Sequence, residues 1–476
     1  MLRWRWTLAL FLTLRMLSAQ SLTESIDALL DVDWLRYGYC GVVVRDLQTG
    51  ETLYQRDSER VLIPASNMKL LATAAAIHRL GADYCFRTRV WARGALTPDG
   101  VLQGDLILQG LGDATLDVKG LETLAQQVHQ AGVRRVAGYL LYDDSWLDAV
   151  RYGFGWNSGD EPYGYQAQMS ALCAEGNAVR LYAKPAAQVG EPLQLRLEPD
   201  TDYIELVNRT RTVERGAPNT AVDAIRTRAR NQIIVSGALP LGSEEVFVGR
   251  YAVENPSRYA ARLFLKALQA AGVVVERGIT ANLAPIVPAE TPSLRLVAEH
   301  RSPPMREIIA RINKPSDNLL TEITLKALGR EVRGEGTTAA GVQVLREFLQ
   351  SAGLEMGAVH IVDGSGLSRI NGVSAENFVR LLEYMHRSPH AEAFRESLPV
   401  YGVDGTLRNR LRGTPVQGNS FAKTGSLNRV SSLSGYLRTQ SGRWLAFSII
   451  MNAYNAPASD ARALQDKLVQ LLWERL

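Results

Sequence analysis

The chemistry that the sequence suggests most directly comes from Ser66 and Lys69, which stand three residues apart. Residues 67–80, an apolar and Ala-rich segment that follows Pro64, favour a helix. Side chains three residues apart on a helix are neighbours, so Lys69 can reach the Ser66 hydroxyl. A buried lysine can lose its proton and act as a general base. We therefore expect Ser66 to be a nucleophile that Lys69 activates.

A serine followed by a lysine three residues later is a weak signal by itself. Ser420 and Lys423 repeat the spacing without a helical segment after them. The alternative for Ser66 is a helix-capping serine beside a surface lysine. Lysine is scarce, however, because only 8 of the 53 basic residues are lysines. Arginine evidently serves wherever a generic cation is enough, which makes each remaining lysine a candidate for chemistry that arginine cannot perform.

Two further motifs complete a possible catalytic set. Ser316-Asp317-Asn318 heads another helical segment, so that a hydroxyl and an amide can complete a proton relay. Lys423-Thr424-Gly425 is expected just ahead of a strand, where Lys423 can hold a substrate carboxylate and Gly425 lets a peptide backbone approach. The backbone N–H groups of Ser66 and Ser426 can then form an oxyanion hole. The order Ser-x-x-Lys, Ser-x-Asn, Lys-Thr-Gly is the signature of penicilloyl-serine transferases.

The elements that must position these motifs are clearest at the two ends of the chain. Residues 41–47 and 52–55 predict a β-hairpin, and residues 432–438 and 444–451 predict two strands before a helix at 459–476. Residues 178–250 contain short alternating runs that indicate a β-rich unit. The leucines of the last helix favour packing on a sheet, with a peripheral membrane contact as the alternative.

Composition excludes several classes of protein. Hydrophobic residues make up 46% of the 476 residues, which is typical of a globular chain with at least one large core. The net charge is only +4 and includes three arginines among the first 15 residues, so nucleic acid is not expected as a partner. The six histidines have no metal-ligand spacing, and we expect neither a metal nor another cofactor.

The N-terminus predicts export. Residues 1–19 combine a charged start, a short apolar stretch and a small residue at the end, as a secretory signal peptide does. The alternative is a retained membrane anchor, although the apolar run is short for a span and Arg15 interrupts it. We expect the protein in the periplasm or on the outer face of the cytoplasmic membrane.

With these motifs the chain resembles the class C, low-molecular-mass penicillin-binding proteins, which are D-Ala-D-Ala carboxypeptidase/endopeptidases with a large insertion. The matching stretches span nearly the whole mature chain and include 104–106, 112–116, 363–369, 404–407 and 430–436. Ser426 departs from the family, which usually has Thr there. The backbone N–H group of residue 426 is present with either side chain, so it can still donate a hydrogen bond.

The resemblance implies an α/β (α+β) fold: a β-lactamase/transpeptidase-like domain, in which helices flank an antiparallel sheet, with a large inserted region. We expect this discontinuous domain at 20–90 and 296–476, an inserted α/β subdomain at 91–177 and 251–295, and a nested β-rich subdomain at 178–250.

The resemblance also implies a substrate and a pocket for it. The enzyme is expected to hydrolyse peptidoglycan stem peptides through an acyl-enzyme on Ser66, and β-lactam antibiotics are expected to acylate the same serine. Asp160, Tyr165 and Arg369 match a region that faces the diamino-acid arm of the substrate in relatives. The alternative for Asp160 and Arg369 is a solvated loop carboxylate and a structural arginine. Two other functions stay open: a β-lactamase and a non-catalytic peptidoglycan-binding scaffold.

Overall fold

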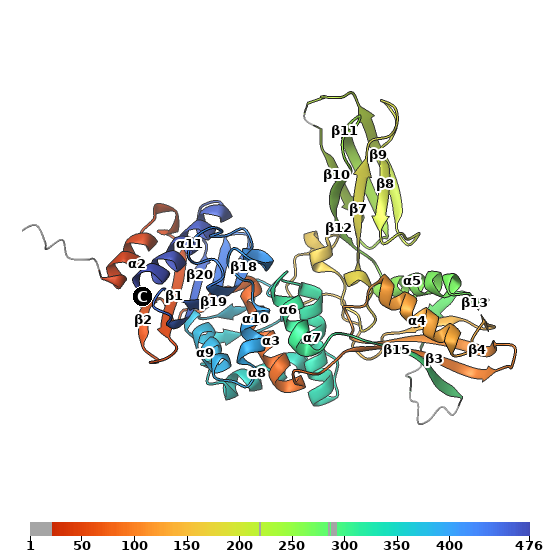
Figure 1. Ribbon diagram of the computed structural model, residues 1–476, viewed down its shortest axis with the longest axis horizontal. Helices are drawn as coiled ribbons and strands as arrows, with labels where there is room; N and C mark the ends of the chain where they lie inside the picture. The colour runs from red at the N-terminus through yellow and green to blue at the C-terminus, as the bar shows by residue number, and fades with distance from the viewer. Residues whose placement is uncertain (1–20, 219, 284–285, 287–292) are drawn as a thin grey trace, which may run out of the picture.

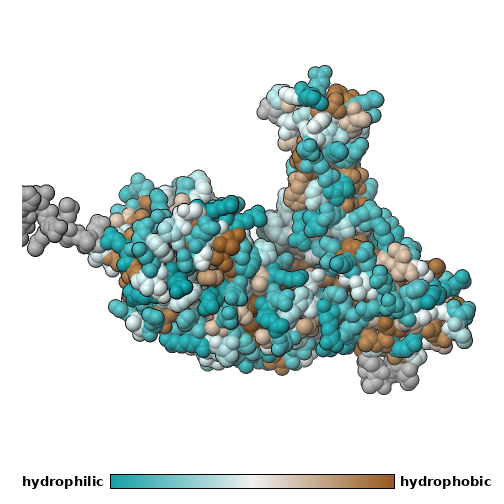
Figure 2. Space-filling view, viewed as in Figure 1, coloured by the Kyte–Doolittle hydropathy of each residue, from teal (hydrophilic) through white to brown (hydrophobic). Residues whose placement is uncertain are grey.

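The computed structural model describes residues 21–218, 220–283, 286 and 293–476 (Figure 1). The predicted signal peptide, residues 1–19, lies outside the described residues. No helix of the described part is long and apolar enough to cross a membrane. The face of the molecule in Figure 2 is mostly hydrophilic, with scattered hydrophobic residues.

A five-stranded antiparallel sheet joins the two ends of the chain, in the order β18-β19-β20-β1-β2. The hairpin predicted near the N-terminus and the two strands predicted near the C-terminus are confirmed, and a further strand, β18, forms one edge. The strands are β1 (Tyr39–Asp46), β2 (Thr52–Arg56), β18 (Ser420–Leu427), β19 (Val430–Arg438) and β20 (Trp444–Asn452).

Both faces of this sheet are buried, because alternate residues of each strand enter different cores. Val42 and Val44 pack with α2 (Leu22–Leu30) and α11 (Ala458–Arg475), whereas Val43 packs on the opposite face. Three leucines of α11 at helical spacing, Leu464, Leu468 and Leu472, are buried in the first of these cores, as the packing interpretation predicts.

Six helices cover the second face and share one hydrophobic core. They are α3 (Met68–Leu80), α6 (Met305–Asn313), α7 (Asn318–Arg333), α8 (Thr338–Ser351), α9 (Ala375–His386) and α10 (Ala391–Ser397). A small ladder of β16 (Val359–His360) and β17 (Gly372–Val373) lies beside them. The sheet and its two helical layers are called the core unit below.

The chain between α3 and α6 forms a second sheet, which two helices accompany. Its strands are β3 (Arg87–Leu96), β4 (Val101–Leu111), β5 (Arg135–Val136), β6 (Leu140–Asp143), β13 (Val274–Val275), β14 (Ile279–Ala281) and β15 (Leu294–Arg301). The helices are α4 (Val118–Gln130) and α5 (Pro256–Ala270), whose apolar faces pack in the same core as β3 and β4.

The pairing of β15 with β3 corrects two expected boundaries. The two strands are antiparallel neighbours from Leu294 opposite Arg93 to Arg301 opposite Arg87. The inserted sheet therefore begins at Arg87 and ends at Arg301, so the boundaries placed at 90/91 and 295/296 cut through paired strands. Hydrogen bonding between distant segments decides these limits, and local sequence pattern does not report it.

A slender β unit rises from the inserted region (Figure 1). It contains two three-stranded sheets, in the orders β12-β7-β8 and β10-β11-β9. The strands are β7 (Ala178–Lys184), β8 (Gln194–Glu198), β9 (Glu205–Val213), β10 (Val222–Arg226), β11 (Gln232–Pro240) and β12 (Val246–Ala252). The boundary expected at 250/251 cuts through β12, which pairs with β7 as far as Ala252 opposite Ala178. We call this part the β7–β12 unit.

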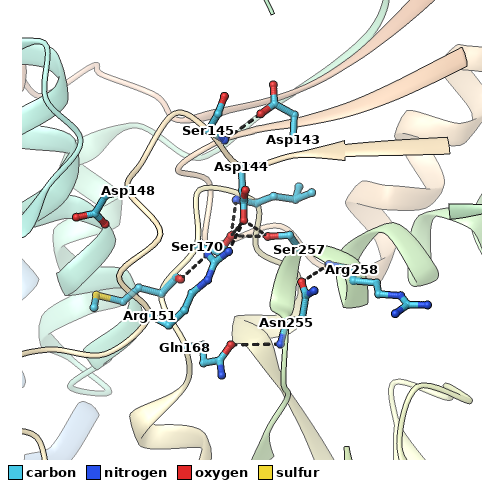
Figure 3. Close-up of polar contacts among 12 residues, drawn as sticks. Asp143, Asp144, Ser145, Asp148, Arg151, Gln168, Ser170, Asn255, Ser257 and Arg258 are labelled. Carbon is cyan, nitrogen blue, oxygen red and sulfur yellow. Dashed lines mark hydrogen bonds and ion pairs between the residues drawn. The ribbon is translucent and has the colours of Figure 1, made fainter. Parts of the chain in front are cut away.

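Polar contacts fix the segment that runs from β6 toward the core unit. Asp144 accepts hydrogen bonds from Ser257 Oγ at 2.5 Å, Ser170 Oγ at 3.3 Å and Arg151 Nη2 at 2.6 Å (Figure 3). These contacts join the segment to the start of α5. Burial opposes ionisation of Asp144, but the bonds from Ser257 and Arg151 outweigh it and lower the pKa of the carboxyl.

A buried lysine then attaches the same segment to the core unit. Lys326, on α7, is 1% exposed and pairs with Asp148, while its Nζ also donates to the Val150 carbonyl at 2.9 Å. Because α7 begins at Asn318, this ion pair sets the inserted region against a helix that contributes to the site described next.

Candidate active site

Ser66 lies in a tight turn that leads directly into α3. A 3₁₀ turn, η2 (Ala65–Asn67), precedes the helix, and Ala65 has a φ of 47° in the left-handed region. Gly366 packs on this turn so closely that a Cβ there would lie 1.9 Å from the Ala65 carbonyl oxygen. The turn is thus held from outside, which maintains a backbone conformation that is strained for alanine.

Lys69 is the second residue of α3, and its side chain is completely buried. Its Nζ is 3.1 Å from Ser66 Oγ, 2.6 Å from Asn318 Oδ1 and 2.7 Å from the Ser365 carbonyl oxygen. Burial lowers the pKa of Lys69 to about 8, although the charges of nearby carboxylates oppose this shift. A sizeable neutral fraction near neutral pH would let Lys69 accept the Ser66 proton.

Ser316 and Lys423 form a second serine–lysine pair in the same site. Lys423 Nζ donates to Ser316 Oγ at 2.9 Å and to the Thr424 carbonyl at 2.9 Å. Ser316 has a φ of 63°, and Asp317 caps α7 by accepting from the Leu320 N–H at 2.8 Å. Burial, together with the positive charge of Lys69, holds the pKa of Lys423 well below its usual range. A substrate carboxylate would stabilise the protonated form.

The Lys-Thr-Gly motif lies inside β18, the edge strand, and not ahead of a strand as expected. Lys423 pairs with Ser434 of β19, and Gly425 pairs with Ser432. A Cβ on Gly425 would lie 2.9 Å from the Ser66 nitrogen and 2.7 Å from the Pro64 carbonyl oxygen. Only glycine therefore lets β18 come this close to the Ser66 turn.

The expected oxyanion hole depends on this approach, because Ser426 follows Gly425 along the same strand edge. The pairing of the Ser66 and Ser426 N–H groups around an oxyanion stays a prediction. Thr424 Oγ1 is 2.8 Å from Thr406 Oγ1, which fixes its hydroxyl at the same edge.

Tyr165 reaches the site from the inserted region. Its carbonyl oxygen accepts from Asn318 Nδ2 at 2.8 Å, so Asn318 joins Tyr165 to Lys69. The Tyr165 ring stacks on Tyr163 at 5.6 Å between centroids. Burial and a hydrogen bond to Asp160 raise the pKa of the Tyr165 phenol.

Arg369 is exposed, and its Nη1 donates to the Asn428 carbonyl at 3.0 Å. Asn428 belongs to the turn between β18 and β19. Asp160 thus contacts Tyr165, whereas Arg369 contacts the hairpin formed by β18 and β19. Their joint action on a substrate arm stays a prediction.

Two buried carboxylates beneath the site were missed from sequence. Glu322 is fully buried on α7, one turn after Asn318, and accepts from the Gly364 and Ser365 N–H groups at 3.0 and 2.7 Å. Burial and the charge of Asp363 raise the pKa of Glu322 to about 7. The spacing of four residues from Asn318 on a helix is the signal that could have indicated Glu322.

Asp363 fixes the loop whose carbonyl group faces Lys69. It accepts from the Gly366 and Ser368 N–H groups, both at 2.8 Å, and from Trp156 Nε1 at 2.9 Å. Trp156 comes from the inserted region, so this loop is held from both sides. Among the described residues, no group of three or more His, Cys, Asp and Glu side chains could hold a metal ion.

The fold and the site together define a serine acyl-transfer enzyme that has a lysine as its candidate base. The model of the "D-Ala-D-Ala carboxypeptidase 3 (S13) family" matches residues 22–475. The chain belongs to this family.

Two curated relatives agree with this assignment. The D-alanyl-D-alanine carboxypeptidase of Actinomadura sp. (strain R39) is 40% identical over 464 residues, which cover 95% of this chain and 84% of the relative. The D-alanyl-D-alanine carboxypeptidase DacB of Haemophilus influenzae is 25% identical over 434 residues, which cover 90% and 88%.

Solved structures show the same fold. The crystal structure of penicillin binding protein 4 (dacB) from Haemophilus influenzae matches with a TM-score of 0.81 and 24% identity, over 94% of this chain and 98% of the other. The same protein complexed with a novel β-lactam matches with a TM-score of 0.75 and 23% identity, over the same shares of the two chains.

Proposed function

We propose that this serine-type D-Ala-D-Ala carboxypeptidase acts on peptidoglycan stem peptides, with Ser66 as the nucleophile and Lys69 as the general base. The observation that carries the assignment is the 3.1 Å contact between Lys69 Nζ and Ser66 Oγ. Complete burial makes the neutral form of that lysine accessible.

In the proposed acylation, Ser66 Oγ attacks the carbonyl carbon of the penultimate D-Ala while Lys69 takes the hydroxyl proton. The N–H groups of Ser66 and Ser426 stabilise the oxyanion that forms. The C–N bond then breaks, and the departing D-Ala nitrogen receives the proton through Ser316, with Asn318 orienting the substrate. Lys423 and Thr424 hold the terminal carboxylate. Water finally hydrolyses the ester and frees Ser66.

We assign the diamino-acid arm of the stem peptide to Asp160, Tyr165 and Arg369. Asp160 can pair with an ammonium group and the exposed Arg369 with a carboxylate. The contact between Tyr165 and Asn318 supports this placement, because it puts the same loop at the edge of the proposed catalytic set.

We also propose that the protein is exported with residues 1–19 as a signal peptide, and that it works in the periplasm or at the outer face of the cytoplasmic membrane. Peptidoglycan lies in that compartment. N-terminal sequencing of the mature protein tests the cleavage directly: a chain that still begins with Met1 would contradict it.

Fluorescent penicillin tests the nucleophile. Ser66→Ala should fold normally and bind no penicillin covalently, because among the described residues no other hydroxyl contacts Lys69 Nζ. Ser420→Ala is the control, since Ser420 has the same spacing to a lysine but is buried and donates to the Tyr436 carbonyl at 3.0 Å. Labelling of the Ser66→Ala protein at the wild-type level would move the nucleophile elsewhere.

The lifetime of the penicilloyl adduct separates this function from the alternatives. A D,D-peptidase should hold the adduct for a long time while it releases D-Ala from stem peptides. Rapid loss of the adduct without peptide turnover would indicate a β-lactamase, and absence of any adduct a non-catalytic scaffold. Mass spectrometry of purified muropeptides after incubation measures the peptide reaction.

A further inference from the structure

A groove leads away from Ser66 over the edge strand β18 toward the first turns of α11. Its volume is about 1070 Å³, and its lining includes Ser66, Ser316 and Thr424 of the proposed catalytic site together with Arg408, from the loop before β18, and Arg462, from α11. Pockets for drug-sized ligands measure about 300–1,000 Å³. The groove is therefore much larger than a single departing D-Ala requires.

The leaving group is expected to enter this groove, because residues proposed to act on that part of the substrate line it. Ser316, which bonds to Lys423 and is the proposed proton donor to the departing nitrogen, lines it. Asn318 and Tyr165 form the other side of the site and do not line it. The acyl part of the substrate belongs with Tyr165, so the part beyond the scissile bond points toward the arginines.

The charges in the groove are not all neutralised. Arg410 is paired with Asp466 at 2.7 Å and Lys314 with Asp404 at 2.5 Å. The Arg408 side chain, by contrast, is exposed and has no ion pair or hydrogen bond to the described residues.

Arg462 is exposed too, and its Nε donates to the Ala458 carbonyl of its own helix at 3.1 Å. Within the described residues it contacts no carboxylate. Two guanidinium groups are thus free to bind an anion, and guanidinium matches the geometry of a carboxylate.

We propose that the groove binds the leaving strand of a cross-linked stem peptide and that Arg408 and Arg462 bind a carboxylate on that strand. The inference rests on the proposed function, because it takes Ser66 as the nucleophile. The carboxylate beside the scissile nitrogen takes the place of the D-Ala carboxylate at Lys423 and Thr424. A second carboxylate, farther along the leaving strand, reaches the arginines.

The reaction on this substrate balances without a co-reactant other than water. Ser66 Oγ forms an ester with the D-Ala carbonyl carbon, and the C–N bond of the cross-link breaks. The released amine takes the proton that Lys69 removed from Ser66. Water then hydrolyses the ester, so the net change is hydrolysis of one amide bond.

The test compares two purified substrates, a cross-linked muropeptide dimer and the monomeric pentapeptide, with Arg408→Gln and Arg462→Gln. Each substitution should lower kcat/KM for the dimer roughly tenfold, the worth of one charge-assisted contact. The monomer does not reach the arginines, so its turnover and penicillin acylation should stay within about twofold of wild type. Arg412→Gln, an exposed arginine of the same loop outside the groove, is the matched control.

A dimer in which only the second, farther carboxylate of the leaving strand is amidated identifies the anion, since its turnover should be insensitive to both substitutions, while the carboxylate bound at Lys423 and Thr424 is kept. Equal rates for wild type and variants on the unmodified dimer would overturn the groove assignment. A parallel fall with monomer and dimer would also overturn it, because the arginines would then support the catalytic centre. If the wild-type protein is not acylated at Ser66 at all, the proposed function fails instead.

Discussion

Lys69 in the active site and Arg226 at the base of the β7–β12 unit are both fully buried cations with opposite surroundings. Lys69 bonds to a hydroxyl and two neutral oxygens, and carboxylates act on it only from a distance. Arg226 forms ion pairs with Glu161 at 2.9 Å and Glu254 at 3.0 Å.

The difference in surroundings matches a difference in chemistry: Lys69 can lose its proton, whereas Arg226 keeps its positive charge. Burial without a contacting carboxylate favours the neutral form of lysine, which a general base requires. A guanidinium keeps its proton, so two carboxylates around Arg226 compensate a permanent buried charge. The surroundings of Lys69 therefore suit a catalytic base, and those of Arg226 suit a rigid structural contact.

A chain of contacts runs from Arg226 to the proposed catalytic residues. Glu161 belongs to the segment that contains Tyr165, and the Tyr165 carbonyl accepts from Asn318 Nδ2. Burial opposes ionisation of Glu161, but bonds from the Ala229 N–H and from Arg226 lower the pKa of its carboxyl. The β7–β12 unit thereby holds one wall of the active site.

The largest effect is expected for Lys69→Arg. Arginine keeps the positive charge but has no accessible neutral form. Acylation by penicillin should fall by about 10²–10⁴, the usual worth of a general base. Stopped-flow measurement of acylation checks this. A near-normal rate would show that Lys69 acts only through its charge, and the contrast with Arg226 would disappear.

Arg226→Met should instead act on stability. Removing one partner of a buried ion pair leaves uncompensated charge and costs about 3–5 kcal/mol. Denaturant unfolding measures this free energy, with the exposed Arg228→Met as the control. If Arg226→Met lowers the free energy of unfolding no more than the control does, the ion pairs of Arg226 with Glu161 and Glu254 do not stabilise the fold.

Arg369 provides a third case, an exposed arginine that is available to a substrate. The proposed contact of Arg369 with a substrate carboxylate would be worth about 1.5–3 kcal/mol. Arg369→Ala should therefore lower turnover of peptides with a free arm carboxylate roughly 10- to 100-fold. Acylation by a simple penicillin, which lacks the arm, should barely change. A joint decline of both reactions would indicate that Arg369 supports the hairpin through Asn428.

The elements around the catalytic motifs were predictable because short-range spacing determines them. Ser66 and Lys69 share one helical turn, and Ser316-Asp317-Asn318 stands where an N-cap is expected. The position of Lys423 inside β18 was not predictable, since that strand is defined by its pairing with β19 and not by its own composition.

The joints between regions were even less accessible to sequence analysis. Arg226 and Glu161 are 65 positions apart, and Trp156 and Asp363 are 207 apart. Neither pair has a local pattern, because each depends on how the inserted region packs against its neighbours. Strand β10, which carries Arg226, is likewise defined by its pairing with β11.

The smallest effect concerns the carboxylate that acts on Lys69 from a distance. Acylation requires neutral Lys69, whose fraction rises with pH through a pKa of about 8. The wild-type rate should therefore increase about tenfold between pH 7 and pH 9. The charge of Glu322 raises the pKa of Lys69, so Glu322→Gln should move the rise to lower pH.

The expected gain for Glu322→Gln is roughly two- to threefold in acylation rate at pH 7.5, because the neutral fraction of Lys69 increases while Ser66 stays in place. The glutamine carbonyl can still accept from the Gly364 and Ser365 N–H groups, so the loop beneath Lys69 keeps its support. Glu335→Gln, an exposed carboxylate just after α7, is the control. An unchanged profile would mean that burial alone sets the pKa of Lys69. A loss of rate at every pH would mean that Glu322 positions the loop and does not tune the base.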